Sequence, residues 1–195
     1  MLAAVILSGG ASSRMGSPKA LLPYQGRPFL EHLLEVTAIP QIGVRRVVLG
    51  AHAEPISKVV NLKADEIVIN HDWEKGQLSS IQAALRSLPP GTEAMLLCLI
   101  DHPLISAALV QDLIEQFYKT KAPIVLPVYE GRRGHPVIFS ASLYDELLRA
   151  PLETGSRAVV WAHKGEIAEV RTNEEGCVLN LNDPETLNSA IPPKN

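Results

Sequence analysis

The fold is decided by residues 3–19, Ala3-Ala4-Val5-Ile6-Leu7-Ser8-Gly9-Gly10-Ala11-Ser12-Ser13-Arg14-Met15-Gly16-Ser17-Pro18-Lys19. The first five residues are an apolar run of the length of a buried strand, and a glycine-rich loop with two cations follows at once. Gly9 and Gly10 lack a Cβ, so the backbone can turn sharply and bring N–H groups close to a phosphate chain. Arg14 can bind phosphate oxygens through two N–H groups, and Lys19 adds a mobile point charge. The stretch therefore predicts a strand that ends in an anion-binding loop.

The spacing within this loop excludes two common phosphate-binding motifs. No Gly-Lys-Ser/Thr completes a Walker A sequence, and the chain contains no G-x-G-x-x-G. An ATP-hydrolysing or kinase module is therefore disfavoured, and the loop is expected to belong to another class of nucleotide-binding site.

Length and composition are those of one ordinary soluble domain. The 195 residues are 46% hydrophobic and 20% charged, so residues 1–195 are expected to bury a core and form a single domain. The net charge of −3 argues against a nucleic-acid partner, because no surplus of basic residues exists to bind a phosphate backbone. No apolar run reaches the roughly 18 residues of a membrane span, so we expect no membrane partner and a cytoplasmic location. Cys98 and Cys177 lie in apolar, strand-like runs without metal-site spacing, which predicts reduced core thiols rather than a disulfide.

Strand-like and helix-like patterns alternate along the rest of the chain. This alternation favours a mostly parallel sheet with right-handed crossovers and helices on both faces. Beyond residues 3–7, the expected strands are 44–50, 66–69, 95–100, 123–129, 137–139 and 167–170. The expected helices are 29–37, ended by Pro40, and 54–62, 81–88, 106–118 and 142–149.

The most hydrophobic run, Met95 to Ile100, is predicted to be the central strand, and it delivers Asp101 at its carboxyl end. In open α/β sheets this edge is where ligands bind, so the carboxylate is a candidate for the site. An alternative is that Asp101 hydrogen-bonds the turn at His102-Pro103 or caps the helix near Ser106.

Two other polar segments have structural explanations that compete with functional ones. Gly76 fits a turn, and Ser79 or Ser80 fits an ordinary residue at the start of a helix. Asp183-Pro184-Glu185 fits a helix N-cap, with proline at the first helical position and an acid in the first turn.

Residues 7–19 resemble the signature L-[AS]-[AG]-G-x-S-x-R-M-G-x-x-K of the molybdenum cofactor nucleotidyltransferases. These belong to the wider family of nucleotidyltransferases with a GT-A-like Rossmann fold. The continuation A-L-L-P at residues 20–23 and F-L-E-H at residues 29–32 resembles the cytidylyltransferase branch. The resemblance implies an α/β fold of three layers, α/β/α, with a mostly parallel sheet, as in the nucleotide-diphospho-sugar transferases.

The resemblance also implies where the nucleotide binds. Residues 70–80 resemble the family segment N-x-x-W-x-x-G-x-x-x-S, whose loop and serine approach the base and ribose. Carried over position by position, the nucleotide-binding residues are Leu7, Ser8, Gly9, Gly10, Arg14, Lys19, Gly76, Ser79 and Ser80.

For the metal, Asp101-His102-Pro103-Leu104 resembles the family motif G-D-x-P-[LM], in which the aspartate binds Mg²⁺; Ile100 replaces the glycine. Residues 180–187 resemble D-I-[DN]-T-P-E-D-L, which puts Asn182 at the metal position and leaves Asp183 as a fallback ligand. An amide oxygen is an acceptable Mg²⁺ ligand.

For the acceptor, residues 131–137 resemble G-x-x-G-H-P-[VA], which places His135 on the acceptor side. Arg132 and Arg133 are candidates to attract an acceptor phosphate. Arg157 lies in a loosely matching segment and is assigned no role.

The implied reaction is transfer of a nucleoside monophosphate to the terminal phosphate of molybdopterin or its molybdenum-loaded form, with Mg²⁺ as cofactor and Arg14, Lys19 and Asp101 as catalytic residues. CTP is the favoured donor; GTP stays open because the second glycine of the loop resembles the guanylyltransferase branch. A sugar-phosphate acceptor and a non-catalytic nucleotide-binding protein remain alternatives. Delivery of the product to a molybdoenzyme would be the downstream partnership.

Overall fold

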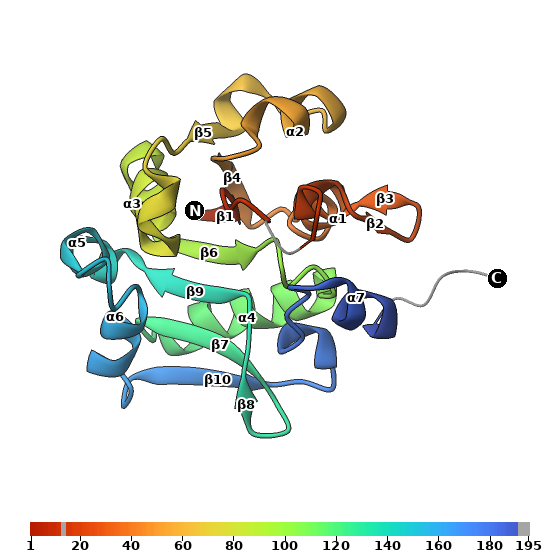
Figure 1. Cartoon of the computed structure of the whole chain (residues 1–195). Coiled ribbons are helices and arrows are strands. Elements are labelled where there is room, and N and C mark those ends of the chain that lie inside the picture. Colours follow the sequence, from red (N-terminus) through yellow and green to blue (C-terminus); the bar gives the residue numbers. More distant parts are fainter. Residues whose placement is uncertain (13–14, 191–195) are drawn as a thin grey trace.

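The structure is a computed structural model that describes residues 1–12 and 15–190, with an α/β arrangement (Figure 1). Its main sheet has the strand order β10-β7-β9-β6-β1-β4-β5, with β8 paired to β7. These strands are β1 (Leu2–Ser8), β4 (Ile42–Leu49), β5 (Ile67–Ile69), β6 (Ala94–Leu99), β7 (Ile124–Tyr129), β8 (Arg132–Arg133), β9 (Val137–Ser140) and β10 (Ile167–Arg171). A separate two-stranded hairpin consists of β2 (Pro23–Tyr24) and β3 (Arg27–Pro28).

The helices follow the predicted alternation. They are α1 (Phe29–Val36), α2 (Ala53–Val59), α3 (Gln77–Ser87), α4 (Ala107–Thr120), α5 (Tyr144–Arg149), α6 (Arg157–Ala162) and α7 (Pro184–Ala190). Within the described ranges, no helix combines the length and the apolar character that crossing a membrane requires.

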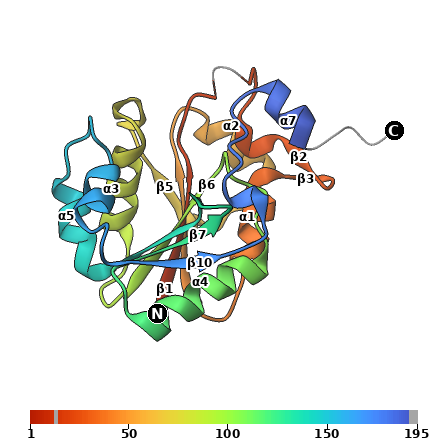
Figure 2. The same ribbon diagram turned by 90° about the horizontal axis from the view of Figure 1, so that it is seen from below.

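The sheet separates two apolar clusters, as alternation along its strands requires. Ile6 of β1 packs in one cluster with α1, α2 and α4, whereas Val5 and Leu7 pack in the other with α3 and α5. Figure 2 shows α1 and α4 on one side of the sheet and α3 and α5 on the other. The three-layer architecture and the central, fully buried position of β6 are therefore confirmed.

The sheet is mixed, because β9 runs antiparallel to both β6 and β7. The connection from β7 to β9 holds only residues 130–136 and includes the short strand β8, which pairs antiparallel with β7. So short a connection cannot make the crossover that a parallel pair needs, whereas it can join antiparallel strands. The remaining pairs β1–β4, β1–β6, β4–β5 and β7–β10 are parallel, as predicted.

Several local expectations were wrong. Helix α3 begins at Gln77, four residues before the predicted start, and Gly76 with φ +93° occupies its N-cap position. Ser79 and Ser80 therefore lie in the first turn of the helix and neither is its N-cap. Helix α2 ends at Val59 because the next residue is already extended. Cys177 lies in a 3₁₀ turn and not in a strand, although both cysteines are buried and free, as predicted.

Candidate functional site

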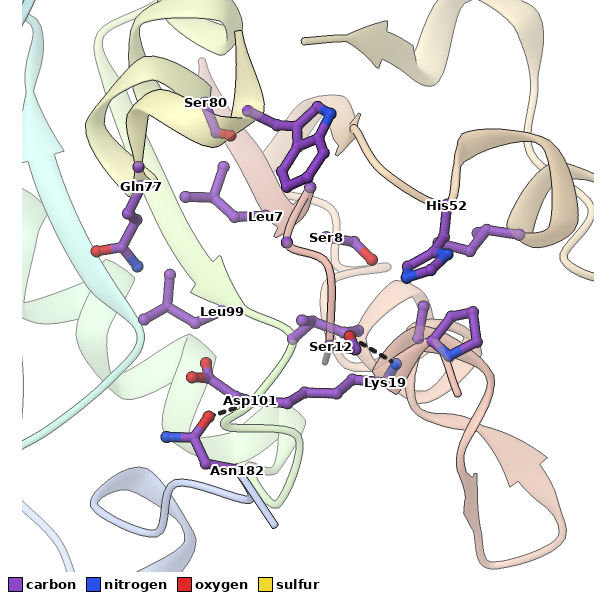
Figure 3. A pocket seen from close by; sticks show the side chains of 18 residues that line it. Leu7, Ser8, Ser12, Lys19, His52, Gln77, Ser80, Leu99, Asp101 and Asn182 are labelled. Carbon is purple, nitrogen blue, oxygen red and sulfur yellow. Dashed lines mark hydrogen bonds between the residues drawn. The ribbon is translucent and has the colours of Figure 1, made fainter. Parts of the chain in front are cut away.

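A cavity of about 300 Å³ opens at the carboxyl ends of β1 and β6 (Figure 3). The chain adds β4 and β5 on one side of β1 and then places β6 on the other side. Such a reversal of strand order leaves a crevice beyond the strand ends, which is the usual ligand site of open α/β sheets. The cavity volume is at the lower end of the range for small-molecule sites.

Nine of the residues predicted from the sequence line this cavity together. They are Leu7, Ser8, Gly9, Gly10, Lys19, Gly76, Ser80, Asp101 and Asn182. Ser79 and His135 are not among the lining residues, and Arg14 lies outside the described part of the chain. Sequence reasoning missed His52, Trp73 and Gln77, which also line the cavity.

The glycine loop is held against the end of β4 by close backbone packing. The Ala51 N–H donates to the Gly9 carbonyl oxygen over 3.1 Å. A Cβ on Gly50 would overlap that same oxygen and would lie 2.7 Å from Trp73 Cβ. Gly50 therefore permits the approach that places Gly9 and Trp73 on two walls of the cavity. The His52 ring contributes by donating from Nε2 to the Ala11 carbonyl over 2.7 Å.

Lys19 connects the glycine loop to the segment before α7. Its backbone N–H donates to Ser12 Oγ over 3.2 Å, which closes the loop, and a 3₁₀ turn begins at Lys19. Its Nζ donates to Asn182 Oδ1. A cation and an amide oxygen separated by 163 positions in the sequence thus meet in the cavity, as Figure 3 shows.

Asp101 is held by the segment before α7. The Leu181 N–H donates to the Asp101 carbonyl over 2.8 Å, and Asn180 Nδ2 donates to Asp101 Oδ2 over 2.9 Å. The alternative role for Asp101 as a helix cap is wrong, since Ser106 caps α4 by accepting from the Leu109 N–H at 3.1 Å. Asp101 keeps its carboxylate at the cavity wall.

Asn180 is a further residue that sequence reasoning missed. Its side chain binds the Asp101 carboxylate, and its Oδ1 is buried without a hydrogen-bond partner among the described residues. Asp183, by contrast, accepts from the Thr186 N–H at 2.8 Å and caps α7, as predicted.

The oxygen donors of the cavity suit a hard divalent cation. Asp101 offers a carboxylate at the cavity wall, and the amide oxygen of Asn182, which accepts from Lys19 Nζ, keeps a second lone pair. In the part of the chain that the structure describes, no cluster of three His, Cys, Asp or Glu side chains could hold a metal. Mg²⁺ is usually held by one or two carboxylates, with substrate phosphates and waters completing the octahedron. The residues present therefore fit Mg²⁺ that would take some of its ligands from the protein and the rest from a bound nucleotide and water. They do not surround a metal on all sides.

His135 is packed beneath this site rather than in the cavity. The backbone N–H of His135 donates to the Cys177 carbonyl over 2.8 Å. The centroid of its ring lies 5.0 Å from the centroid of the His102 ring. Burial, reinforced by the neighbouring His102, lowers the pKa of His135 to about 4. His135 is therefore neutral at pH 7 and cannot attract an anionic acceptor by charge.

The neighbours of His135 are also occupied by structural contacts. A Cβ on Gly134 would overlap the Cys177 carbonyl oxygen, so glycine is needed where this loop crosses residue 177. Arg133 is paired with Glu169 of β10 at 2.8 Å, although the pair is exposed. Burial raises the pKa of the Cys177 thiol to about 11, which keeps it protonated and inert.

Comparison with known proteins gives one consistent family. The model of the MobA-like NTP transferase domain matches residues 4–167. A nicotine blue oxidoreductase from Paenarthrobacter nicotinovorans is 34% identical over 150 residues, covering 71% of each chain. A probable molybdenum cofactor guanylyltransferase from Bacillus cereus (strain ZK / E33L) is 30% identical over 161 residues, covering 81% of this chain and 77% of that protein.

A solved structure agrees over almost the whole chain. The crystal structure of Rv0371c from Mycobacterium tuberculosis H37Rv has a TM-score of 0.82 at 26% identity, and the match covers 97% of this chain and 96% of that one. A complex of Rv0371c with manganese matches with a TM-score of 0.71 at 25% identity over 88% of each chain.

Proposed function

The chain belongs to the family of the MobA-like NTP transferase domain, a family of nucleotidyltransferases, and on that premise we propose that it is a metal-dependent nucleotidyltransferase. The proposed reaction moves a nucleoside monophosphate from a nucleoside triphosphate to the terminal phosphate of a molybdopterin-type acceptor. Residues 1–195 act in this proposal as one catalytic domain.

One observation carries the proposal. The glycine loop, the Lys19 ammonium and the oxygens of Asp101 and Asn182 line the same cavity at the switch point of the sheet. A site that only binds a nucleotide also uses an ammonium group at the phosphates, but it has no need of a carboxylate there, because a carboxylate repels phosphates unless a metal ion binds both. Their presence together supports transfer chemistry over a purely binding role, which is the competing proposal.

The reaction balances without an added base. An oxygen of the acceptor phosphate forms a bond to the α-phosphorus, and the bond from that phosphorus to the oxygen bridging the β-phosphate breaks. Pyrophosphate leaves with the electron pair. The acceptor phosphate is already ionised near neutral pH, so no residue has to remove a proton from it.

The residues of the site have to reduce the repulsion between two anions. Unit charges about 4 Å apart repel by about 4 kcal/mol at an effective dielectric of 20. Lys19 would neutralise the triphosphate and the departing pyrophosphate, together with Arg14. Asp101 and Asn182 would hold Mg²⁺, which supplies further positive charge at the phosphates when it is bound. The manganese complex of Rv0371c, a structural neighbour of this chain, supports the proposal of a divalent metal.

The donor nucleotide and the acceptor are the finer part of the proposal. Residues 18–23 and 29–32 resemble the cytidylyltransferase branch and favour CTP, whereas the relative in Bacillus cereus named a guanylyltransferase supports GTP. The relative named an oxidoreductase shows that the names within the family are not uniform. We therefore propose CTP and molybdopterin first, with GTP as the alternative donor and a sugar phosphate as the alternative acceptor. Delivery of the product to a molybdoenzyme would follow.

Pyrophosphate release tests the proposal directly. CTP, GTP, UTP and ATP are supplied separately with Mg²⁺, with molybdopterin, with a sugar phosphate or with no acceptor, to the unaltered protein, to Asp101→Ala and to Asp112→Ala, and binding of each nucleotide is measured in parallel. Asp112 is an exposed carboxylate on α4, away from the cavity, and serves as the matched control.

Molybdopterin-dependent release from one nucleotide, lost in Asp101→Ala and kept in Asp112→Ala, is the expected result and identifies the donor. Pyrophosphate release with a sugar phosphate, and none with molybdopterin, would make the sugar phosphate the acceptor. Nucleotide binding without release from any pair would refute transfer and favour the binding protein.

A further inference from the structure

Asn70, the residue after β5, is buried at 5% exposure, and its amide uses both of its hydrogens and one of the two lone pairs of its oxygen in hydrogen bonds. Its Oδ1 accepts from the Asp72 N–H over 3.0 Å, and its Nδ2 donates to Ser79 Oγ and Ser80 Oγ, each over 2.9 Å. The backbone donor at Asp72 fixes the orientation of the amide, because only the oxygen can face an N–H group. Both amide hydrogens therefore point at the serine hydroxyls, and both hydroxyls are acceptors in these bonds.

The two serines differ in where their own protons go. Ser79 Oγ lies 2.9 Å from the Asp72 carbonyl oxygen and 2.8 Å from the Gly76 carbonyl oxygen, so its proton has an acceptor. Ser80 Oγ accepts from Asn70, and no acceptor for its proton is present among residues 1–12 and 15–190. A hydroxyl carries one proton and two lone pairs, so the Ser80 proton is left unused.

The Ser80 hydroxyl is beside the glycine loop in the cavity. Ser80 lines the cavity although it is only 5% exposed, and a Cβ on Gly9 would lie 3.1 Å from Ser80 Oγ. Figure 3 shows Ser80 and Asp101 on opposite sides of the cavity, with Leu7 and Leu99 between them. A group that meets Ser80 is therefore remote from the carboxylate at the proposed metal position.

From these contacts we infer that Asn70 is a positioning residue that holds the Ser80 hydroxyl as a hydrogen-bond donor to an acceptor atom on the nucleoside of the bound triphosphate. This inference rests on the proposed function, because it takes the cavity to hold a nucleotide. Asn70 itself touches no ligand. It acts by occupying a lone pair of Ser80 Oγ, which leaves the proton free to point into the cavity.

The substitution Asn70→Asp separates this role from simple packing, because it keeps the shape and reverses the polarity of the bond. A carboxylate still accepts from the Asp72 N–H but has no hydrogen to give to Ser80. The Ser80 proton then turns toward the carboxylate, and a lone pair faces the nucleoside. Binding should weaken as in Ser80→Ala, where the donor is absent.

The test is a double-mutant cycle read by calorimetric titration with Mg²⁺-CTP and Mg²⁺-GTP. For the nucleotide that the unaltered protein binds, Ser80→Ala should raise Kd by about 5- to 10-fold, the effect of one neutral hydrogen bond. Asn70→Asp should raise Kd at least as much in the unaltered background and much less in the Ser80→Ala background. Ser87→Ala, on the same helix but outside the cavity, should leave Kd unchanged.

Steady-state kinetics give a second measurement, because a partly unfolded variant would lose kcat, whereas the inference expects a change in KM alone. Because Ser80 contacts the nucleoside and not the reacting phosphates, Asn70→Asp should raise KM for the triphosphate while kcat stays within about twofold. Thermal unfolding of each variant checks the fold. If Asn70→Asp does not fold, Asn70→Ala takes its place, since it also releases the Ser80 hydroxyl from its fixed orientation.

The outcomes are distinct. Nucleotide binding by the unaltered protein with equal losses from Asn70→Asp in both backgrounds would overturn the inference and leave the proposed function intact. No binding of any triphosphate by the unaltered protein would overturn both.

Discussion

Replacement of Gly50 by alanine should damage both the fold and the nucleotide site. The added Cβ would overlap the Gly9 carbonyl oxygen and lie 2.7 Å from Trp73 Cβ, whereas ordinary contact begins at 3.4 Å. Both neighbours are firmly attached, one as backbone and the other as the root of a side chain, so neither can rotate away. Overpacking of this kind costs about 1–3 kcal/mol, and weakening the bond from Ala51 N–H to Gly9 adds about 1 kcal/mol.

The expected loss is therefore about 2–4 kcal/mol, which for a chain of 195 residues lowers Tm by about 4–16 °C. Scanning calorimetry measures this loss, and titration with Mg²⁺-CTP and Mg²⁺-GTP should show weaker binding because Gly9 and Trp73 line the cavity. Gly43→Ala is the matched control, since its Cβ would meet the Met1 Sδ at 2.8 Å, the mobile end of a flexible side chain. A Gly50→Ala variant with the Tm and the affinity of Gly43→Ala would refute the packing argument.

Three further variants test separate parts of the structure. Asn180→Leu removes the hydrogen bond to the carboxylate at the proposed metal position, so kcat/KM for pyrophosphate release should fall on the order of tenfold or more; unchanged kinetics would count against that role. Ser106→Ala removes the N-cap of α4 and should lower Tm by about 2–4 °C, a cost of about 1 kcal/mol, with pyrophosphate release retained. Hydrogen bonds to Glu166 and then Glu146 raise the pKa of His163, so the protein should be more stable than His163→Gln, by about 0.5 kcal/mol, below pH 6.5 and lose this advantage as pH rises through the raised pKa. Urea unfolding at pH 5.5 and 9 measures the difference, and equal differences at both values would contradict it.

The sequence identified the parts of the site that local patterns encode. The apolar run before Gly9 and the run before Asp101 predict two buried strands, and strand ends of a parallel sheet meet at one edge. Those two predictions alone place the glycine loop and the carboxylate on the same edge of the sheet, and the structure adds that their strands are neighbours. The N-cap at Asp183 was equally predictable, because Asp-Pro-Glu combines three separate helix-start signals in consecutive positions.

What the sequence could not supply were the contacts between distant segments. The pattern around Asn180 does not show that its side chain meets Asp101, 79 positions earlier. The resemblance that puts Asn182 at the metal position likewise does not show its contact with Lys19, 163 positions earlier. The start of α3 was missed for a related reason. Ser79 and Ser80 are residue types that often cap helices, but both hydroxyls accept from Asn70 and neither caps α3. The helix begins at Gln77 instead, with Gly76 at the N-cap position.

The charge of the described cavity explains why a metal belongs in the proposal. Apart from the imidazole of His52, Lys19 and Asp101 are the only ionisable side chains among the described residues that line it, and their opposite charges cancel. A nucleoside triphosphate entering this cavity therefore meets no net positive charge from these residues. Asp101 on its own would repel the phosphates. The hydrogen bond from Asn180 orients the Asp101 carboxylate, but the neutral amide does not compensate its charge. A divalent cation held by Asp101 would remove the repulsion between the carboxylate and the phosphates. Asn182 would provide a second oxygen for that cation without adding negative charge.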